Sequence, residues 1–149
     1  MTDNTAGAGK VPWSFWLVAI IAVLWNGFGG YDYYMSHTAG DAYFQGMGMT
    51  EAQIAYMHAF PAWMTAVWAI GVWGAVLGSI LLLLRRRWAF HAFAISLAAI
   101  VVSLIYTYLL SNGGEVMGQN GLIMQLVVLA GGAFFAWYSR RMAARGLLR

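Results

Sequence analysis

The chain has 149 residues, of which 62% are hydrophobic and only 9% are charged. A soluble domain usually carries about 25% charged residues, and the mean hydropathy of +0.67 is typical of a membrane protein. The composition therefore excludes a soluble enzyme, a DNA-binding domain and a disordered chain. The absence of cysteine excludes disulfides, a thiolate nucleophile and a cysteine-based metal site.

Uncharged apolar stretches divide the chain into four predicted membrane-spanning helices. Such a helix needs roughly 20 apolar residues, and charged residues or a proline bound each stretch. The spans are predicted at about residues 12–31, 61–84, 88–111 and 121–139. Together they form a membrane domain over residues 11–141, between a polar cytoplasmic tail at 1–10 and a basic cytoplasmic tail at 142–149.

The segment between the first two spans carries signals of a short helix. Thr50 is followed three residues later by Gln53, the spacing of a capping box. Pro61 is suited to the first turn of a helix and disrupts a helix interior. The sequence therefore predicts a short interfacial helix at residues 51–59 and a second span that starts at Pro61.

The charges predict the orientation of the spans. If both termini share one side of the membrane, all eight Lys and Arg lie on that side, and every acidic residue except Asp3 lies on the other. Lys and Arg are enriched in cytoplasmic loops, so both termini are expected in the cytoplasm. The predicted fold class is an all-α membrane protein, an antiparallel four-helix transmembrane bundle with one interfacial helix before the second span.

The second span carries a row of small residues. Gly71, Gly74 and Gly78 share one face of the expected helix, and two of them form a GxxxG pattern. Glycines allow helix backbones to approach closely in lipid. This face is expected to serve helix packing, either inside the bundle or between two copies of the chain.

Polar side chains gather in the outer half of the predicted bundle, whereas the cytoplasmic half offers only small hydroxyls. A polar group in lipid is costly, so its position is informative. We expect an outward-facing vestibule that contacts a ligand or a partner, unless these groups only bond one another. Its predicted residues are Asn26, Asp32, His58, Thr65, Tyr106 and Gln125. Because no known catalytic motif is present, we expect neither an enzyme nor a cofactor.

Methionine and histidine are concentrated on the same outer side. Thioether and imidazole ligands without thiolate suit Cu(I), although methionine also fills irregular gaps in packing. An outward-facing copper(I) site is therefore a minor hypothesis. Its ligands would come from Met35, His37, Met47, Met49, Met57 and His58.

Three segments carry a resemblance to a known group of proteins: residues 24–32 (Leu-Trp-Asn-Gly-Phe-Gly-Gly-Tyr-Asp), residues 61–63 leading through the glycine-rich span to 84–89, and residues 106–115. With these motifs the chain resembles a family of small bacterial four-helix inner-membrane proteins, over about residues 12–145. Members are often labelled sugar transporters, although no activity is characterised. The resemblance implies a multi-pass protein of the bacterial inner membrane.

Two main hypotheses of function follow. The first is an accessory or assembly subunit of a membrane complex, because the chain is small, lacks a catalytic set and has glycine-lined helix faces. The second is a transporter of a small, sugar-like solute that acts as an oligomer, since the apolar cytoplasmic half leaves one copy without a polar path. Expected partners are the lipid bilayer and other protein chains or copies of this chain, with no nucleic acid.

Overall fold

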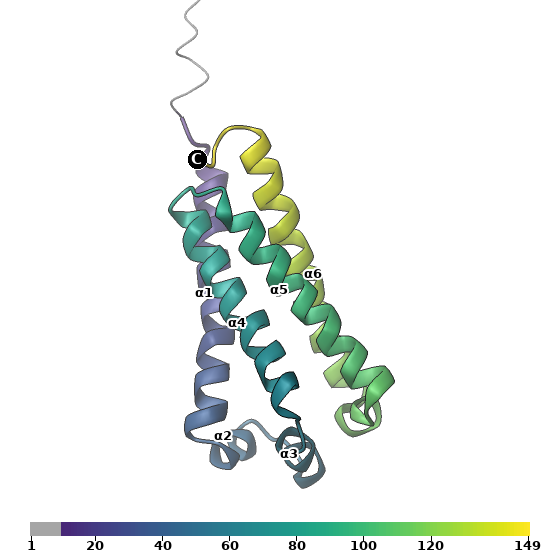
Figure 1. Ribbon diagram of the computed structural model, residues 1–149. Coiled ribbons are helices and arrows are strands. Elements are labelled where there is room, and N and C mark those ends of the chain that lie inside the picture. Colours follow the sequence, from purple (N-terminus) through teal and green to yellow (C-terminus); the bar gives the residue numbers. More distant parts are fainter. Residues whose placement is uncertain (1–9) are drawn as a thin grey trace, which may run out of the picture.

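The computed structural model describes residues 10–149, which contain helices and no strand (Figure 1). Four helices are long and apolar enough to cross a membrane, which confirms the predicted all-α class and the number of spans. The predicted tail at residues 1–10 lies, apart from Lys10, outside the described part. The elements are α1 (Trp13–Thr38), α2 (Asp41–Gly46), α3 (Glu51–His58), α4 (Ala62–Leu83), α5 (Trp88–Ile105), the π-helical turn η2 (Tyr106–Leu110) and α6 (Gly113–Ala144).

The two helix starts predicted between the first spans are present. The Thr50 hydroxyl accepts a hydrogen bond of 3.2 Å from the Gln53 amide, and the Gln53 side chain accepts one of 3.0 Å from the Thr50 amide. This capping box begins α3. Pro61 is the N-cap residue of α4, where its missing N–H costs no helical hydrogen bond.

Two spans differ in length from the prediction. Helix α1 continues to Thr38 instead of ending near residue 31. Its last turn contains polar side chains that bond to the preceding turn: the Ser36 hydroxyl donates to the Asp32 carbonyl over 2.7 Å, and the Thr38 hydroxyl to the Tyr34 carbonyl over 2.8 Å. These bonds allow a polar segment to remain helical.

The fourth span was expected from residue 121 to 139, but helical backbone runs from Gly113 to Ala144. It is broken at Gly118, whose φ of 69° and ψ of −167° are accessible to glycine and strained for other residues. The prediction missed the short stretch before this break, because it consists largely of polar residues and glycines.

Helix α4 packs between α1 and α5, and α6 packs on the other side of α5. The structure places Gly71, Gly74 and Gly78 against α5. A Cβ atom at Gly78 would lie 2.9 Å from the Phe93 ring, and one at Gly74 would lie 3.3 Å from the Ser96 Cβ. The three glycines therefore serve a contact inside the chain.

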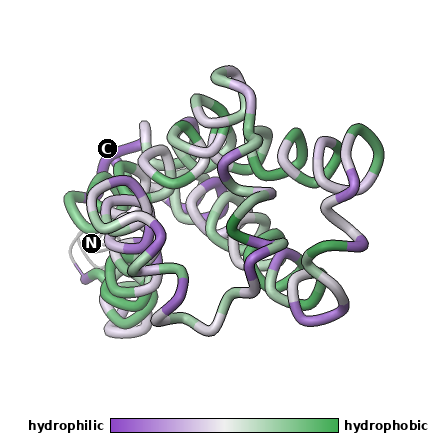
Figure 2. Tube along the Cα trace, turned by 90° about the horizontal axis from the view of Figure 1, so that it is seen from below, coloured by the Kyte–Doolittle hydropathy of each residue, from purple (hydrophilic) through white to green (hydrophobic). Residues whose placement is uncertain are grey.

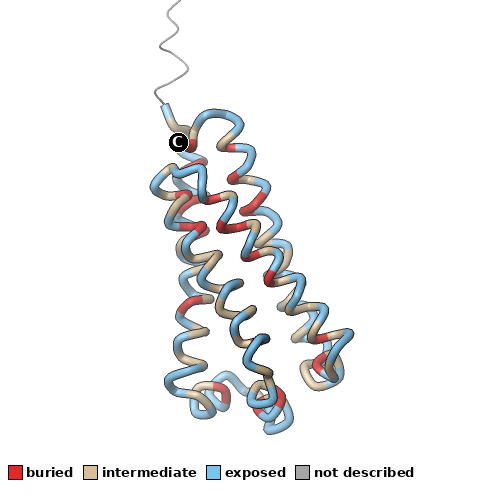
Figure 3. The backbone as a smooth tube through the Cα atoms, in the orientation of Figure 1, coloured by how far each residue is buried: buried red, intermediate tan, exposed pale blue. Residues whose placement is uncertain are grey.

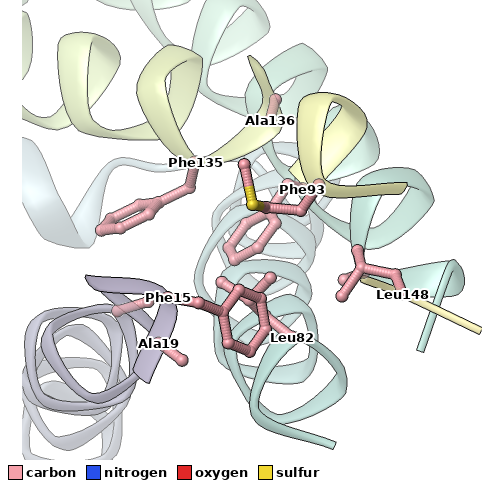
Figure 4. Packing of buried hydrophobic residues seen from close by; sticks show 10 residues of the cluster. Phe15, Ala19, Leu82, Phe93, Phe135, Ala136 and Leu148 are labelled. Atoms are coloured by element: carbon pink, nitrogen blue, oxygen red, sulfur yellow. The ribbon is translucent and has the colours of Figure 1, made fainter. Parts of the chain in front are cut away.

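The helices are packed most tightly at one end of the molecule. We call this the arginine end, because it holds the arginines at 85–87 and those of the C-terminal segment; the opposite end, with α2 and α3, we call the acidic end. Buried residues are concentrated toward the arginine end (Figure 3). There Phe15, Leu82, Phe93, Phe135 and Leu148 form the main core (Figure 4).

Toward the acidic end the bundle opens. Helices α1 and α6 meet near the arginine end, where the rings of Phe15 and Tyr138 stack at a centroid distance of 6.4 Å, and they diverge along their length (Figure 1). Viewed from the acidic end, the helices remain largely apolar (Figure 2). The protein is thus a bundle closed at one end and open at the other.

The last residues fold back onto the turn between α4 and α5. The Arg87 amide donates to the Arg149 carbonyl over 2.8 Å, and the Arg149 amide donates to the Arg85 carbonyl over 2.7 Å. The Leu148 side chain between them is 1% exposed. The segment that we expected as a basic tail at residues 142–149 therefore ends in a fixed position against the bundle, because Leu148 fills part of the core.

Candidate functional site

Asn26 was expected in the outer vestibule, but it lies in the middle of α1 and contacts α4. Its side-chain amide donates a hydrogen bond of 2.8 Å to the Ser79 hydroxyl. Ser79 is 1% exposed and also bonds to the Ala22 and Ala75 carbonyls. The pair thus ties α1 to α4, and the extension of α1 explains why Asn26 is farther from the acidic end than predicted.

Helix α2, which the sequence did not predict, is held by two hydrogen bonds to carboxylates. The Tyr43 hydroxyl of α2 donates to the Asp32 carboxylate of α1 over 2.7 Å. Burial, together with this hydrogen bond and the charge of Asp32, raises the pKa of Tyr43 to about 12. In addition, His58 Nε2 lies 2.6 Å from Asp41 Oδ1, so that α3 is joined to α2. Asp32 and His58 therefore help to hold the short helices at the acidic end.

Tyr106 belongs to a group of aromatic rings that we call the aromatic cluster. The Tyr106 ring lies 5.4 Å from Trp63 and 5.7 Å from Phe60, and Phe60 lies 6.4 Å from Trp68, measured between centroids. Trp68 in turn lies 5.0 Å from Tyr33 of α1. The cluster consists of Tyr33, His37, Tyr56, Phe60, Trp63, Trp68, Trp73 and Tyr106, contributed by α1, α3, α4, η2 and the residue before Pro61. No spacing in the sequence indicates this assembly, because its members come from separate helices.

Helix α3 is also fixed to the connection between α5 and α6. The Tyr56 and Ser111 hydroxyls are 2.8 Å apart, and the Gln53 side-chain amide donates to the Val116 carbonyl over 3.3 Å. A Cβ atom at Gly113 would collide with the Tyr56 hydroxyl. Helix α3 is therefore docked across the acidic end, and of the side chains that hold it there the sequence analysis had singled out only Gln53, for its capping role.

Two polar atoms near this end have no hydrogen-bond partner within residues 10–149. They are the hydroxyl of Tyr108 in η2 and the amide oxygen of Gln125 in α6, and both atoms are buried. Leaving such an atom unpaired costs about 1–3 kcal/mol. Gln125 was predicted as a vestibule residue and Tyr108 was not; Thr65, also predicted, is half-buried in the first turn of α4.

The histidines of the copper hypothesis are held in different contacts. The His37 ring stacks against Tyr33 at 4.2 Å and lies 5.2 Å from Trp68, whereas His58 bonds to Asp41. Met47 is exposed, while Met35, Met49 and Met57 are half-buried. Within residues 10–149, no group of three or more His, Asp or Glu is placed to hold a metal ion.

The acidic end is thus a hydrogen-bonded and aromatic cap over a bundle that opens beneath it. It brings Asp32, His58 and Tyr106 into the contacts of this cap, places Asn26 deeper in the bundle, and leaves Gln125 unpaired on α6. No protein-family model matches the chain, and neither a curated protein nor a solved structure matches it.

Proposed function

We propose that the chain is an accessory or assembly subunit of a complex in the bacterial inner membrane, and that a helix of a partner protein packs on its α1. The observation that carries this proposal is an exposed glycine in the middle of α1, Gly27. A Cβ atom at Gly27 or Gly29 would meet nothing within 4 Å, whereas one at Gly30 would lie 3.2 Å from Trp73. Packing within the chain accounts for Gly30 and leaves the other two unexplained.

Glycine inside a helix costs roughly 0.5–1 kcal/mol relative to alanine. Within a membrane this cost is offset where a second helix approaches closely, since small residues at the contact let the two backbones come together. Much helix surface is also free for a partner, because only 11% of the spanning window of α6 and 22% of that of α1 are buried. Residues two apart on a helix do not share a face, so a partner that packs on the exposed Gly27 would not also cover Gly29.

The proposed orientation has both termini in the cytoplasm and the four long helices antiparallel. Among the described residues, every charged side chain at the arginine end is a Lys or an Arg. The acidic residues belong to the opposite half or its connections: Asp32, Asp41, Glu51 and Glu115. This separation agrees with the enrichment of Lys and Arg in cytoplasmic loops. The aromatic cluster and α3 would then lie at the outer surface of the inner membrane.

The proposal is tested by purifying the full chain in native nanodiscs and identifying bound proteins by native mass spectrometry. We expect one partner in fixed stoichiometry. A leucine at Gly27 would prevent the close approach of a partner helix. The Gly27→Leu variant should therefore retain about 10-fold less of the partner, which corresponds to a loss of roughly 1.4 kcal/mol in binding free energy. The control is Ala66→Leu, which places the same side chain at an exposed position of α4. Purification without any partner, or equal retention by both variants, would contradict the proposal.

The second candidate is an oligomeric transporter of a small, neutral polar solute. The unpaired Tyr108 hydroxyl and Gln125 amide oxygen favour it, since a donor and an acceptor of this kind fit the hydroxyls of a sugar-like solute. Uptake of radiolabelled neutral sugars into proteoliposomes tests it. Transport above background that Gln125→Leu abolishes would support this candidate, and background uptake by the unaltered protein would exclude it for those sugars.

A further inference from the structure

A polar pocket lies at the arginine end, away from the contacts of the acidic end. It has a volume of about 180 Å³ and is lined by Leu84, Arg85, Arg86 and Arg149. We call it the arginine pocket. The fold creates it by bringing the C-terminal segment onto the turn between α4 and α5, so its three arginines come from two distant parts of the chain.

The pocket is rigidly built. The paired backbone hydrogen bonds between the α4–α5 turn and Arg149 fix the two segments, and the buried Leu148 holds the C-terminal segment on the core. The Arg85 Nε donates to the Leu147 carbonyl over 2.9 Å. This bond positions the guanidinium and leaves its terminal nitrogens free to bind a ligand.

The turn contains an arginine where glycine is usual. The amides of Arg85 and Arg86 bond to the Leu82 and Leu81 carbonyls, the pattern that ends many helices with a left-handed residue. Arg85 occupies that position with a φ of 59°, and it is the one non-glycine residue with positive φ in residues 10–149. A strained residue of this kind suggests a functional requirement for its side chain.

The charges of the pocket are not neutralised by carboxylate side chains. The only ion pair in the described part of the chain joins His58 and Asp41 at the opposite end. An α-carboxylate at Arg149 would offset one of the three positive charges and leave the pocket positive. The N-terminus of α5, which begins at Trp88 next to the pocket, adds the positive end of its dipole.

In the proposed orientation, the pocket would lie at the membrane surface. Trp13 and Trp88, at the ends of α1 and α5 on this side, are 76% and 68% exposed. Tryptophan is enriched where membrane and water meet, and basic pockets at this depth bind phosphorylated lipid headgroups. Guanidinium groups bind phosphate with two parallel hydrogen bonds.

We propose that the arginine pocket is a binding site for a phosphate group, supplied by an anionic lipid headgroup or by a free phosphate. This site is independent of the partner face on α1. The exposed Arg86 and Arg149 and the half-buried Arg85, all of which line the pocket, would supply the guanidinium groups.

Binding is measured by native mass spectrometry of the full chain, with any tag at the N-terminus so that the C-terminal segment stays free. Phosphatidylglycerol is titrated against phosphatidylcholine, and inorganic phosphate is added as a competitor. The pocket variants are Arg86→Gln/Arg149→Gln, which leaves the Arg85 hydrogen bond in place, and Arg85→Gly, which also relieves the strained backbone. The control, Arg140→Gln/Arg145→Gln, removes the same number of charges outside the pocket.

We expect phosphatidylglycerol to bind at least about 10-fold more tightly than phosphatidylcholine, and both pocket variants to lose at least about 10-fold in affinity, while the control changes less than about twofold. Arg85→Gly should lose binding while it unfolds at the same or a higher temperature. Displacement by inorganic phosphate without lipid selectivity would support the site with a soluble phosphate as its ligand. Equal losses in the pocket variants and the control, or no binding of either probe, would overturn the proposal.

Discussion

The side-chain amide of Asn26 in α1 donates a hydrogen bond of 2.8 Å to the hydroxyl of Ser79 in α4. The Ser79 hydroxyl also lies 3.1 Å from the Ala22 carbonyl of α1 and 2.8 Å from the Ala75 carbonyl of α4. The bonds of Ser79 to Asn26 and Ala22 join the two helices deep in the bundle. In lipid, where water does not compete, such a bond stabilises the helix pair.

Removal of this bond should destabilise the bundle. Asn26→Ala and Ser79→Ala are each expected to lower the free energy of unfolding by about 1 kcal/mol, and a double-mutant cycle should show coupling of roughly 0.6–1 kcal/mol. Unfolding in mixed micelles with increasing denaturing detergent measures both. Thr38→Ala, which removes an exposed bond within α1, serves as the control. Additive effects of the two substitutions would contradict the assigned contact.

The glycine face of α4 should not tolerate a larger residue. A Cβ atom at Gly78 would lie 2.9 Å from the ring of Phe93, which is 1% exposed and packed in the main core. We expect Gly78→Ala to cost about 1–3 kcal/mol in the same unfolding measurement. Gly27→Ala is the matched control, because it replaces a helical glycine that meets nothing. It should leave the isolated chain unchanged or stabilise it by about 0.5–1 kcal/mol.

The contact between α2 and α1 should weaken at high pH. The pKa of Tyr43 is raised to about 12 by burial and by the Asp32 carboxylate, whereas an unfolded tyrosine has a pKa of about 10. The unfolded chain therefore releases this proton first, so the contribution of Tyr43 to stability is complete below about pH 10 and is lost as the pH rises toward 12.

Phenolate absorbance at 295 nm, taken as the difference between the wild type and Tyr43→Phe, measures this titration. Asp32→Asn should move it toward lower pH, because the neighbouring negative charge is removed while the burial remains. A titration of Tyr43 near pH 10 in the wild type, or one that Asp32→Asn leaves in place, would refute this assignment.

The C-terminal segment should contribute to stability through Leu148. This side chain is 1% exposed and belongs to the main core, so Leu148→Ala is expected to cost about 2–3 kcal/mol. Thermal unfolding in detergent measures the effect. Leu84→Ala, at a site that is 61% exposed, should change little. A loss no larger than that of the control would mean that the segment is detached in solution.

The sequence by itself determined the elements. Long apolar stretches bounded by charges located the second and third spans to within one or two residues, since lipid accepts only apolar helices of this length. Local chemistry was equally informative at Thr50, Gln53 and Pro61, because capping and the missing proline N–H act within a few residues. Sequence failed where polar segments stayed helical, as at the end of α1, in α2 and before the break at Gly118.

Only the tertiary structure decided which residues meet. It paired Asn26 with Ser79, assembled the aromatic cluster from separate helices, and brought Arg149 beside Arg85. These contacts depend on the relative rotation and depth of the helices. Because the helices are apolar on every side, their sequence pattern carries little information about which side packs against a neighbour. Close packing at the glycine face of α4 and around Phe93, together with interhelical hydrogen bonds such as that between Asn26 and Ser79, fixes that rotation and with it the sites at both ends.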